Sequence, residues 1–161
     1  RGLFLQTIYH PLRLYAEHTR DVALDVRVES ETYDLTLRQE TEAFGRVHHV
    51  ADLGPFPLLD AAATCDAAGR ELTLAVVNRD RDRAHAAVVE LGGAAVAGRV
   101  AVTEVNGPDV SATNSFEAPT RVGVRERQLD VTGGRFEYTF PAHSVTVLRL
   151  SILPFPCLAN G

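Results

Sequence analysis

The sequence has no tryptophan, no methionine and only two cysteines among its 161 residues. Carbohydrate-binding modules stack sugars on exposed aromatic rings, so the missing tryptophan argues against a sugar-binding platform. Its longest apolar runs, such as residues 72–77, are far shorter than the about 20 residues that cross a bilayer. The formal charge is −5, with acidic and basic residues interspersed. Because no cluster of Lys and Arg is present, nucleic acid and membrane surfaces are poor partners.

The two cysteines and the start of the chain bear on where the protein works. Cys65 lies in an apolar segment and Cys157 in a proline-rich tail. A disulfide is one interpretation; two unpaired thiols, and with them a reducing cytoplasmic location, are the one we favour. The chain begins at Arg1 without a secretory signal, which suggests a piece of a longer protein.

Alternating apolar and polar residues predict an all-β fold. Residues 22–28 alternate with period two, as a half-buried strand does. Residues 58–65 and 71–77, separated by an Asp-Ala-Ala-Gly turn, predict a hairpin. Gly133-Gly134 predicts a second hairpin between residues 128–131 and 135–140. Further strands are expected at 85–91, 99–105 and 144–150, the last central because it is apolar on both faces. Such spacing of strands and turns is typical of an antiparallel β-sandwich, here jelly-roll-like.

The remaining segments divide the chain. Residues 29–46 are charged and irregular, with one short strand expected at 33–37. Residues 3–15 are apolar, interrupted by Pro11, and could end a helix of another domain. We therefore predict a linker at 1–20, a sandwich domain at 21–150 and a loosely ordered tail at 151–161.

No group of residues predicts chemistry. Neighbours His48 and His49 would face opposite sides of a strand, and the other histidines are dispersed, so we predict no metal site. Those others are His10, His18, His85 and His143. Ser144 follows His143 outside any nucleophile elbow, which makes a hydrolase triad improbable. The paired glycines precede no helix, so no nucleotide or other cofactor is expected. Phe136, Tyr138 and Phe140 share one strand face and are predicted to be core.

Five segments resemble family 51 α-L-arabinofuranosidases, in the family's order. Residues 6–11 (QTIYHP) resemble the segment that leaves the last part of the family's (β/α)8 barrel, although Phe4-Leu5 stands where a Trp and a basic residue are common. Residues 22–30 resemble the return into the sandwich, and residues 72–80 (LTLAVVNRD) a strand that ends in an Asn-Arg turn. Residues 113–119 (TNSFEAP) resemble a family loop, and residues 140–150 (FPAHSVTVLRL) its closing strand.

The resemblance implies the C-terminal sandwich of a retaining enzyme that releases terminal α-L-arabinofuranosyl groups from arabinan and arabinoxylan. Both catalytic glutamates of the family lie on barrel strands that precede Gln6, so we expect no catalytic residue here and no activity from this chain alone. By resemblance, Gln6 contacts the terminal arabinose, while Asn78 and Asn114 form turns or loops. The implied partners are the barrel, an arabinose-containing oligosaccharide and homo-oligomer contacts.

Two other hypotheses stay open on the sequence alone. The chain could be a free-standing sandwich that binds carbohydrate or protein, which an exposed aromatic platform would favour. It could also be the terminal sandwich of another barrel glycosidase, although that hypothesis leaves residues 6–11 unexplained. A bare apolar patch of several hundred Å² would favour the arabinofuranosidase interpretation.

Overall fold

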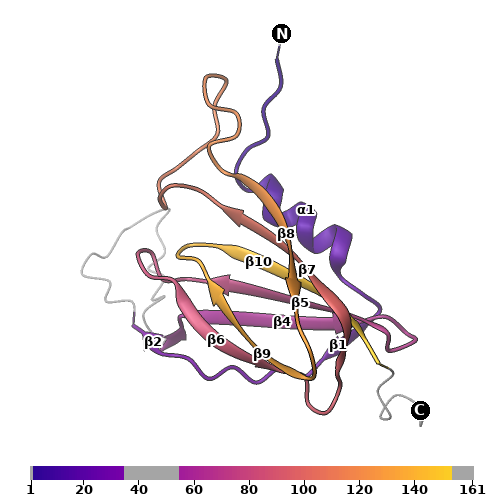
Figure 1. Cartoon of the computed structure of the whole chain (residues 1–161). Helices are drawn as coiled ribbons and strands as arrows, with labels where there is room; N and C mark the ends of the chain where they lie inside the picture. Colours follow the sequence, from indigo (N-terminus) through magenta and orange to yellow (C-terminus); the bar gives the residue numbers. More distant parts are fainter. Residues whose placement is uncertain (1, 35–54, 154–161) are drawn as a thin grey trace, which may run out of the picture.

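The structure, a computed structural model, describes residues 2–34 and 55–153. These residues form one helix and ten strands (Figure 1). In chain order they are α1 (Tyr9–His18), β1 (Val22–Leu24), β2 (Thr32–Tyr33), β3 (Phe56–Pro57), β4 (Leu59–Cys65), β5 (Glu71–Asn78), β6 (His85–Glu90), β7 (Val96–Asn106), β8 (Gly123–Asp130), β9 (Arg135–Phe140) and β10 (Val145–Ile152).

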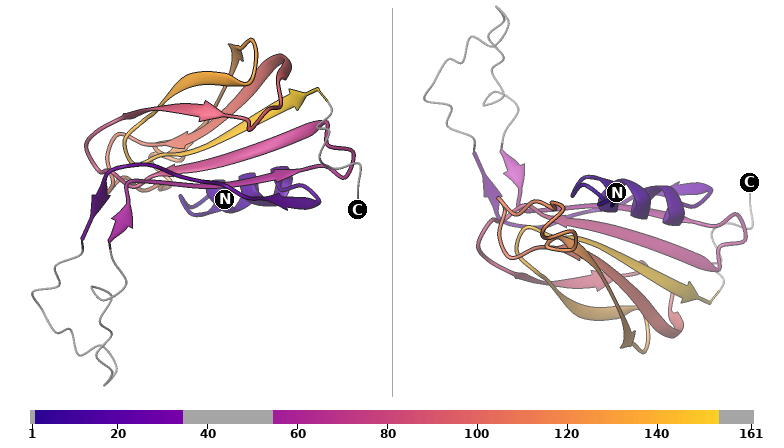
Figure 2. Two further views of the ribbon diagram at one scale, coloured as in Figure 1. Left: turned by 90° about the horizontal axis from the view of Figure 1, so that it is seen from below. Right: turned by 90° about the horizontal axis from the view of Figure 1, so that it is seen from above.

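The strands form an open antiparallel sandwich. Six of them make one sheet in the order β1-β4-β5-β10-β7-β8, and β6 and β9 make a second, smaller sheet. A short β2-β3 ribbon projects from one end (Figure 2). All strand pairs are antiparallel. The predicted all-β sandwich and the central place of residues 144–150 are both confirmed.

The core lies between the two sheets. It contains inward-facing side chains of the large sheet, such as Leu74, Val102 and Leu148, packed against Tyr138 and Phe140 of β9. Val102 and Leu148 are almost completely buried. Burying a side chain of this size stabilises a fold by about 2 kcal/mol. The aromatic stripe on β9 is therefore core, as predicted, with Phe136 only partly buried against it.

Helix α1 covers the outer face of the large sheet, on the side opposite to β6 and β9 (Figure 2). Its buried residue is Leu14, which packs in a second cluster with Val105 and Val147. Pro11 falls in the first helical turn, where its missing N–H would have no partner inside the helix. Residues 9–18, inside the segment 1–20 assigned to a linker, thus belong to the packed fold.

The second predicted hairpin is wrong. β8 pairs with β7 in the large sheet, whereas β9 pairs with β6 in the small one. Between them the chain crosses from sheet to sheet at Gly133, which bridges to Val96 and has φ 84°. A β-carbon at Gly134 would lie 2.2 Å from the carbonyl oxygen of Ala94. The glycine pair reverses the chain as predicted, but alternation does not specify which neighbour a strand pairs with.

Other boundaries differ by a few residues. β1 ends at Leu24, because residues 25–29 leave the sheet and line the space between the two sheets. β7 begins at Val96, ahead of the predicted residue 99. Of the short strand expected at 33–37, Tyr33 lies in β2 and residues 35–37 lie outside the described residues. β10 runs to Ile152, which is buried, so the first part of the predicted tail continues the sheet; residues 154–161 lie outside the described part.

Candidate functional site

The segment that leads into α1 lies beside the loop that joins β7 to β8 (Figure 1). The rings of Phe4 and Phe116 meet edge to face with their centroids 4.8 Å apart. Such pairs add about 0.5–1.5 kcal/mol beyond burial. Two residues that are 112 positions apart in the sequence therefore form one contact at this end of the molecule.

Asn114, in the β7–β8 loop, makes a polar contact with the segment that leads into α1. Its Nδ2 donates to the carbonyl oxygen of Leu5 at 2.9 Å and to that of Val122 at 2.9 Å. Its Oδ1 accepts from the Val122 amide at 2.8 Å. The residue is buried. Asn114 was predicted to form a loop, and it does, but it also holds the backbone directly ahead of Gln6.

The loop around Asn114 is stabilised by its own side chains. Ser115 Oγ donates to Glu117 Oε2 at 2.8 Å and accepts from the Ala118 amide at 3.2 Å. The Ser115 hydroxyl lowers the pKa of Glu117. At the start of the loop the Asp109 carboxylate accepts from the Ser111 amide at 2.8 Å. These local bonds give an irregular loop a defined shape.

Gln6 lies between this loop and the helix. Its side chain is exposed and makes no hydrogen bond within residues 2–34 and 55–153, whereas its carbonyl oxygen accepts from the Tyr9 amide at 2.9 Å. Its backbone is thus held by the fold, and the described residues leave its amide group without a hydrogen-bond partner. Sequence reasoning placed Gln6 at the end of a barrel segment but did not predict the contact with Asn114.

An apolar stripe lies on the outward face of α1, beside the exposed Arg13–Glu17 ion pair. Ile8 at the N-cap, Leu12 and Tyr15 follow each other at helical spacing and are 63%, 62% and 37% exposed. Residues at i, i+4 and i+7 lie on one face of a helix. Leu3 and Phe116 at the same end of the molecule are exposed as well. A helix that has a buried apolar residue on one face and an exposed apolar stripe on another is typical of an element covered from both sides.

A second cluster of polar contacts lies at the turn after β5. Asn78 is 1% exposed, and its Nδ2 lies within 3.1 Å of three carbonyl oxygens. They belong to Arg83, Phe140 and Pro141. Its Oδ1 accepts from the Asp80 amide at 2.9 Å. Asn78 was predicted to form a turn, and it also joins the large sheet to the end of β9.

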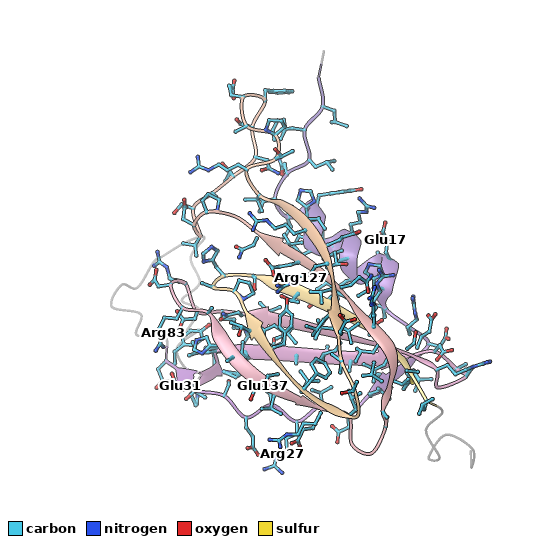
Figure 3. The ribbon with its side chains drawn as sticks, in the orientation of Figure 1. Glu17, Arg27, Glu31, Arg83, Arg127 and Glu137 are labelled. Carbon is cyan, nitrogen blue, oxygen red and sulfur yellow. The ribbon has the colours of Figure 1, made fainter. Side chains whose placement is uncertain are left out.

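Asp80 supports the same turn. Its carboxylate accepts from the amides of Asp82 and Arg83 at 3.0 and 3.1 Å and lies 2.9 Å from His85 Nε2. The Asp82 amide and the His85 ring hold the pKa of this carboxyl well below its usual range. Arg83 also lies 3.5 Å from Glu31 (Figure 3), an ion pair that fastens the segment before β2 to the turn. These contacts all stabilise the turn after β5.

The histidines do not form a metal site within the described residues. No group of three His, Cys, Asp or Glu side chains is placed to hold an ion there. His85 pairs with Asp80, and the His143 ring faces the carbonyl oxygens of Arg81 and Gly107 at 2.7 and 3.2 Å. His48 and His49 lie outside the described residues.

The His143-Ser144 pair does not form a nucleophile and base. Ser144 Oγ donates to the carbonyl oxygen of Pro141 at 2.7 Å, so both side chains are bound to backbone. His143 has φ 44°, which marks a turn residue here.

One carboxylate is buried within the described residues, and it has a cationic partner. Glu104 Oε2 lies 3.6 Å from Arg127 Nη2. Arg127, labelled in Figure 3, also donates to the Tyr138 hydroxyl. A retaining glycosidase needs two carboxyl groups about 5–5.5 Å apart, one of which takes part as a nucleophile. A buried carboxylate that is paired with an arginine and a tyrosine is arranged as an ion pair instead.

A cleft of about 490 Å³ opens between the two sheets. Its lining is mainly aliphatic, including Ala61, Leu72 and Val89, and also contains the charged residues Asp25, Arg27, Glu29 and Glu90; Phe140 is its one aromatic residue among those described. Cys65, a free thiol, also lines it, and burial raises the pKa of that thiol. With one aromatic residue among the described residues that line it, the cleft has no aromatic platform for a sugar.

Among the described residues, no helix combines the length and the apolar character that a membrane span requires.

Comparison with known proteins places these features in a family. The family model described as "Alpha-L-arabinofuranosidase C-terminal domain" matches residues 1–144. The chain is 36% identical over 148 residues to "Probable alpha-L-arabinofuranosidase C" of Aspergillus clavatus, which covers 92% of this chain and 26% of that protein. It is 32% identical over 128 residues to "Extracellular exo-alpha-L-arabinofuranosidase" of Streptomyces chartreusis, covering 80% of this chain and 15% of that one.

Solved structures of α-L-arabinofuranosidases also align with this chain. The α-L-arabinofuranosidase of Thermotoga maritima, determined in complex with arabinose, aligns with TM-score 0.77 and 30% identity over 93% of this chain and 30% of its own. The GH51 α-L-arabinofuranosidase of Thermotoga petrophila aligns with TM-score 0.72 and 29% identity, over 92% and 29% of the two chains. The chain therefore spans about a quarter of the length of the Aspergillus relative it matches.

Proposed function

The chain belongs to the C-terminal domain family of GH51 α-L-arabinofuranosidases, and from this we propose that it is the non-catalytic sandwich of such an enzyme. The whole protein would release terminal α-L-arabinofuranosyl groups from arabinan or arabinoxylan with retention of configuration. The nucleophile and the acid/base would both lie in a preceding (β/α)8 barrel. In this proposal the 161 residues have no hydrolytic activity alone.

The observation that carries the proposal is the apolar outer face of α1. Ile8, Leu12 and Tyr15 are exposed on a helix that is already anchored to the sheet through Leu14. Leu3, nearer the start of the chain, is exposed as well. Exposed apolar patches of this kind mark surfaces that another domain covers. We assign the surface to the barrel, because a barrel that precedes Gln6 would lie next to it.

Gln6 is the proposed substrate contact. Its carboxamide can both donate to and accept from sugar hydroxyls. The side chain is exposed at the end of the molecule where the chain would leave the barrel. The ligand in this proposal is the terminal arabinose of an oligosaccharide, the sugar named in the Thermotoga maritima structure. Contacts between copies of the whole enzyme are part of the proposal as well.

The cellular location is a separate question. We predicted a cytoplasmic protein from two unpaired thiols, and the Streptomyces relative is named extracellular, which argues against that prediction. Cys65 is unpaired and buried, and a buried thiol is compatible with either compartment. An extracellular location is therefore the proposal that the relatives favour.

The free-standing binding module has less support. Tyr138 and Phe140, from the aromatic stripe on β9, are 5% and 2% exposed, so this stripe forms no sugar platform. The cleft between the sheets is lined mainly by aliphatic side chains, and Phe140 is the one aromatic residue that lines it among those described, so it offers little surface for sugar stacking.

Hydrolysis of 4-nitrophenyl α-L-arabinofuranoside tests the proposal. We expect no activity from the 161-residue chain and activity from the same chain extended upstream through its coding sequence. Leu12→Glu in the extended protein should weaken contact with the barrel and lower its melting temperature. Arg13→Ala is the control on the same helix, because Arg13 pairs with Glu17 on the exposed surface, its one ion pair among the described residues, and lies outside the apolar stripe.

Three results would contradict the proposal. Activity of the short chain would mean that it contains a carboxylate pair of its own. Inactivity of both proteins would favour the binding module. Equal melting temperatures for Leu12→Glu, Arg13→Ala and the unchanged extended protein would show that the apolar stripe of α1 does not contact the barrel.

A further inference from the structure

The backbone directly ahead of Gln6 is held by a loop from the far side of the sequence. Asn114 Nδ2 donates to the carbonyl oxygen of Leu5 at 2.9 Å. One residue earlier, the Phe4 ring packs edge to face on Phe116. The two contacts, one polar and one apolar, fix the chain on the N-terminal side of Gln6.

Asn114 is itself held in one orientation. Its Oδ1 accepts from the Val122 amide and its Nδ2 donates to the Val122 carbonyl, both within 2.9 Å. Val122 is 5% exposed and packs in the cluster that contains Leu14 of α1. The remaining hydrogen of the Asn114 amide is therefore directed at Leu5 by a buried neighbour. A side chain whose own rotamer is locked in this way can position another group.

On the other side of Gln6 the chain is anchored by the helix. The Gln6 carbonyl oxygen accepts from the Tyr9 amide, and Leu14 fixes α1 to the sheet. Gln6 therefore lies in a short segment whose backbone is held at both ends, and its side chain is exposed. Holding a contacting group in place before the substrate arrives removes the entropic cost of ordering it during the reaction.

We infer that Asn114 is a positioning residue for the reaction of the whole enzyme: it holds Gln6 where its carboxamide meets the terminal arabinofuranosyl group. The inference rests on the proposed function, since Gln6 is a substrate contact only there. Asn114 does not touch the sugar, and it acts through the carbonyl of Leu5. Phe116 supports the same segment from its apolar side.

A double-mutant cycle in the extended enzyme tests this inference. Gln6→Ala, Asn114→Ala and the double variant are compared by kcat/KM with 4-nitrophenyl α-L-arabinofuranoside. Displacements of about 1 Å cost up to about 100-fold in rate, so we expect Asn114→Ala to lower kcat/KM by about tenfold. Because Asn114 acts through Gln6, the double variant should be no slower than Gln6→Ala alone.

Asn106→Ala is the matched control. Asn106 is a partly buried asparagine at the start of the same loop, and its amide contacts Gly107 and Ala142, not the segment ahead of Gln6. It should leave kcat/KM within about twofold of the unchanged enzyme. Asn114→Asp keeps the shape and the bond from the Val122 amide but places a second oxygen against the Leu5 carbonyl, so its loss should equal or exceed that of Asn114→Ala.

The outcomes separate the inference from the proposed function. An inactive unchanged extended enzyme would refute the proposed function. With an active enzyme, a kcat/KM for Asn114→Ala equal to that of Asn106→Ala would refute the positioning role. Losses in kcat/KM that multiply in the double variant would also refute the positioning role, because they would show that Asn114 acts independently of Gln6.

Discussion

Asn78, at the end of β5, and Asn114, in the β7–β8 loop, are both buried asparagines, and both hold backbone from distant parts of the chain. Asn78 joins β5 to the carbonyl oxygens of Arg83, Phe140 and Pro141, which all belong to the sandwich itself. Asn114 joins the β7–β8 loop to Leu5, in the segment that leads into the molecule. The same chemistry thus stabilises the domain in one place and ties the incoming chain to it in the other.

Each asparagine also has a carboxylate close by in the sequence. Asp80 supports the turn after Asn78 and is held by two backbone amides, His85 and Arg83. Glu117 supports the loop after Asn114, mainly through the Ser115 hydroxyl. Since the first site has more bonds and a more buried asparagine, breaking it should cost more stability than breaking the second.

The largest effect is expected from Asn78→Ala. It removes the donor to buried carbonyl oxygens, including that of Phe140 in the core, and each one left without a donor costs about 1–3 kcal/mol. We expect the free energy of unfolding of the 161-residue chain to fall by about 3 kcal/mol. Urea unfolding measures it. A change below about 1 kcal/mol would mean that water replaces the amide and that the turn is not a structural joint.

Asn114→Ala in the same chain should cost less globally but more locally. The bonds to Val122 and Leu5 are lost, and we expect a fall of about 1–2 kcal/mol. Chymotrypsin cleavage after Phe4 should become at least several-fold faster, because the segment opens without the domain unfolding. If Asn78→Ala accelerated chymotrypsin cleavage equally at the same temperature, cleavage would report global unfolding. The two asparagines would then not differ in the part of the chain that they hold.

Acid should affect the Asp80 turn. The pKa of Asp80 is lowered in the folded chain by the Asp82 amide and the His85 ring. Its contribution is therefore complete above the unfolded pKa of about 3.9 and is lost progressively as the pH falls below it. The melting temperature of Asp80→Asn should lie below that of the unchanged chain at pH 7, and the gap should narrow between pH 4 and pH 2. A gap that is constant with pH would indicate lost geometry rather than a titrating carboxylate.

The comparison also shows which features a sequence can reveal. Alternation predicted the hairpin of β4 and β5 and the central β10, since these strands follow directly from local pattern. It failed at residues 128–140, because the strand on each side of Gly133 can bury its apolar face in either sheet. The role of Asn78 as a turn residue was visible locally. Its bond to Phe140 and the bond from Asn114 to Leu5 were not, because each joins residues far apart in the sequence.

The smallest effect is expected from Glu117→Gln. The Ser115 hydroxyl lowers the pKa of Glu117, but this carboxylate is exposed and has none of the backbone amide donors from following residues that hold Asp80. Exposed single contacts contribute little, and a Gln oxygen still accepts from the hydroxyl. Its melting temperature should stay within about 2 °C of that of the unchanged chain from pH 7 to pH 3. If the difference in melting temperature between Glu117→Gln and the unchanged chain narrowed with falling pH as much as that of Asp80→Asn, the two sites would depend equally on their carboxylates. The difference between the sites would then rest on the asparagines alone.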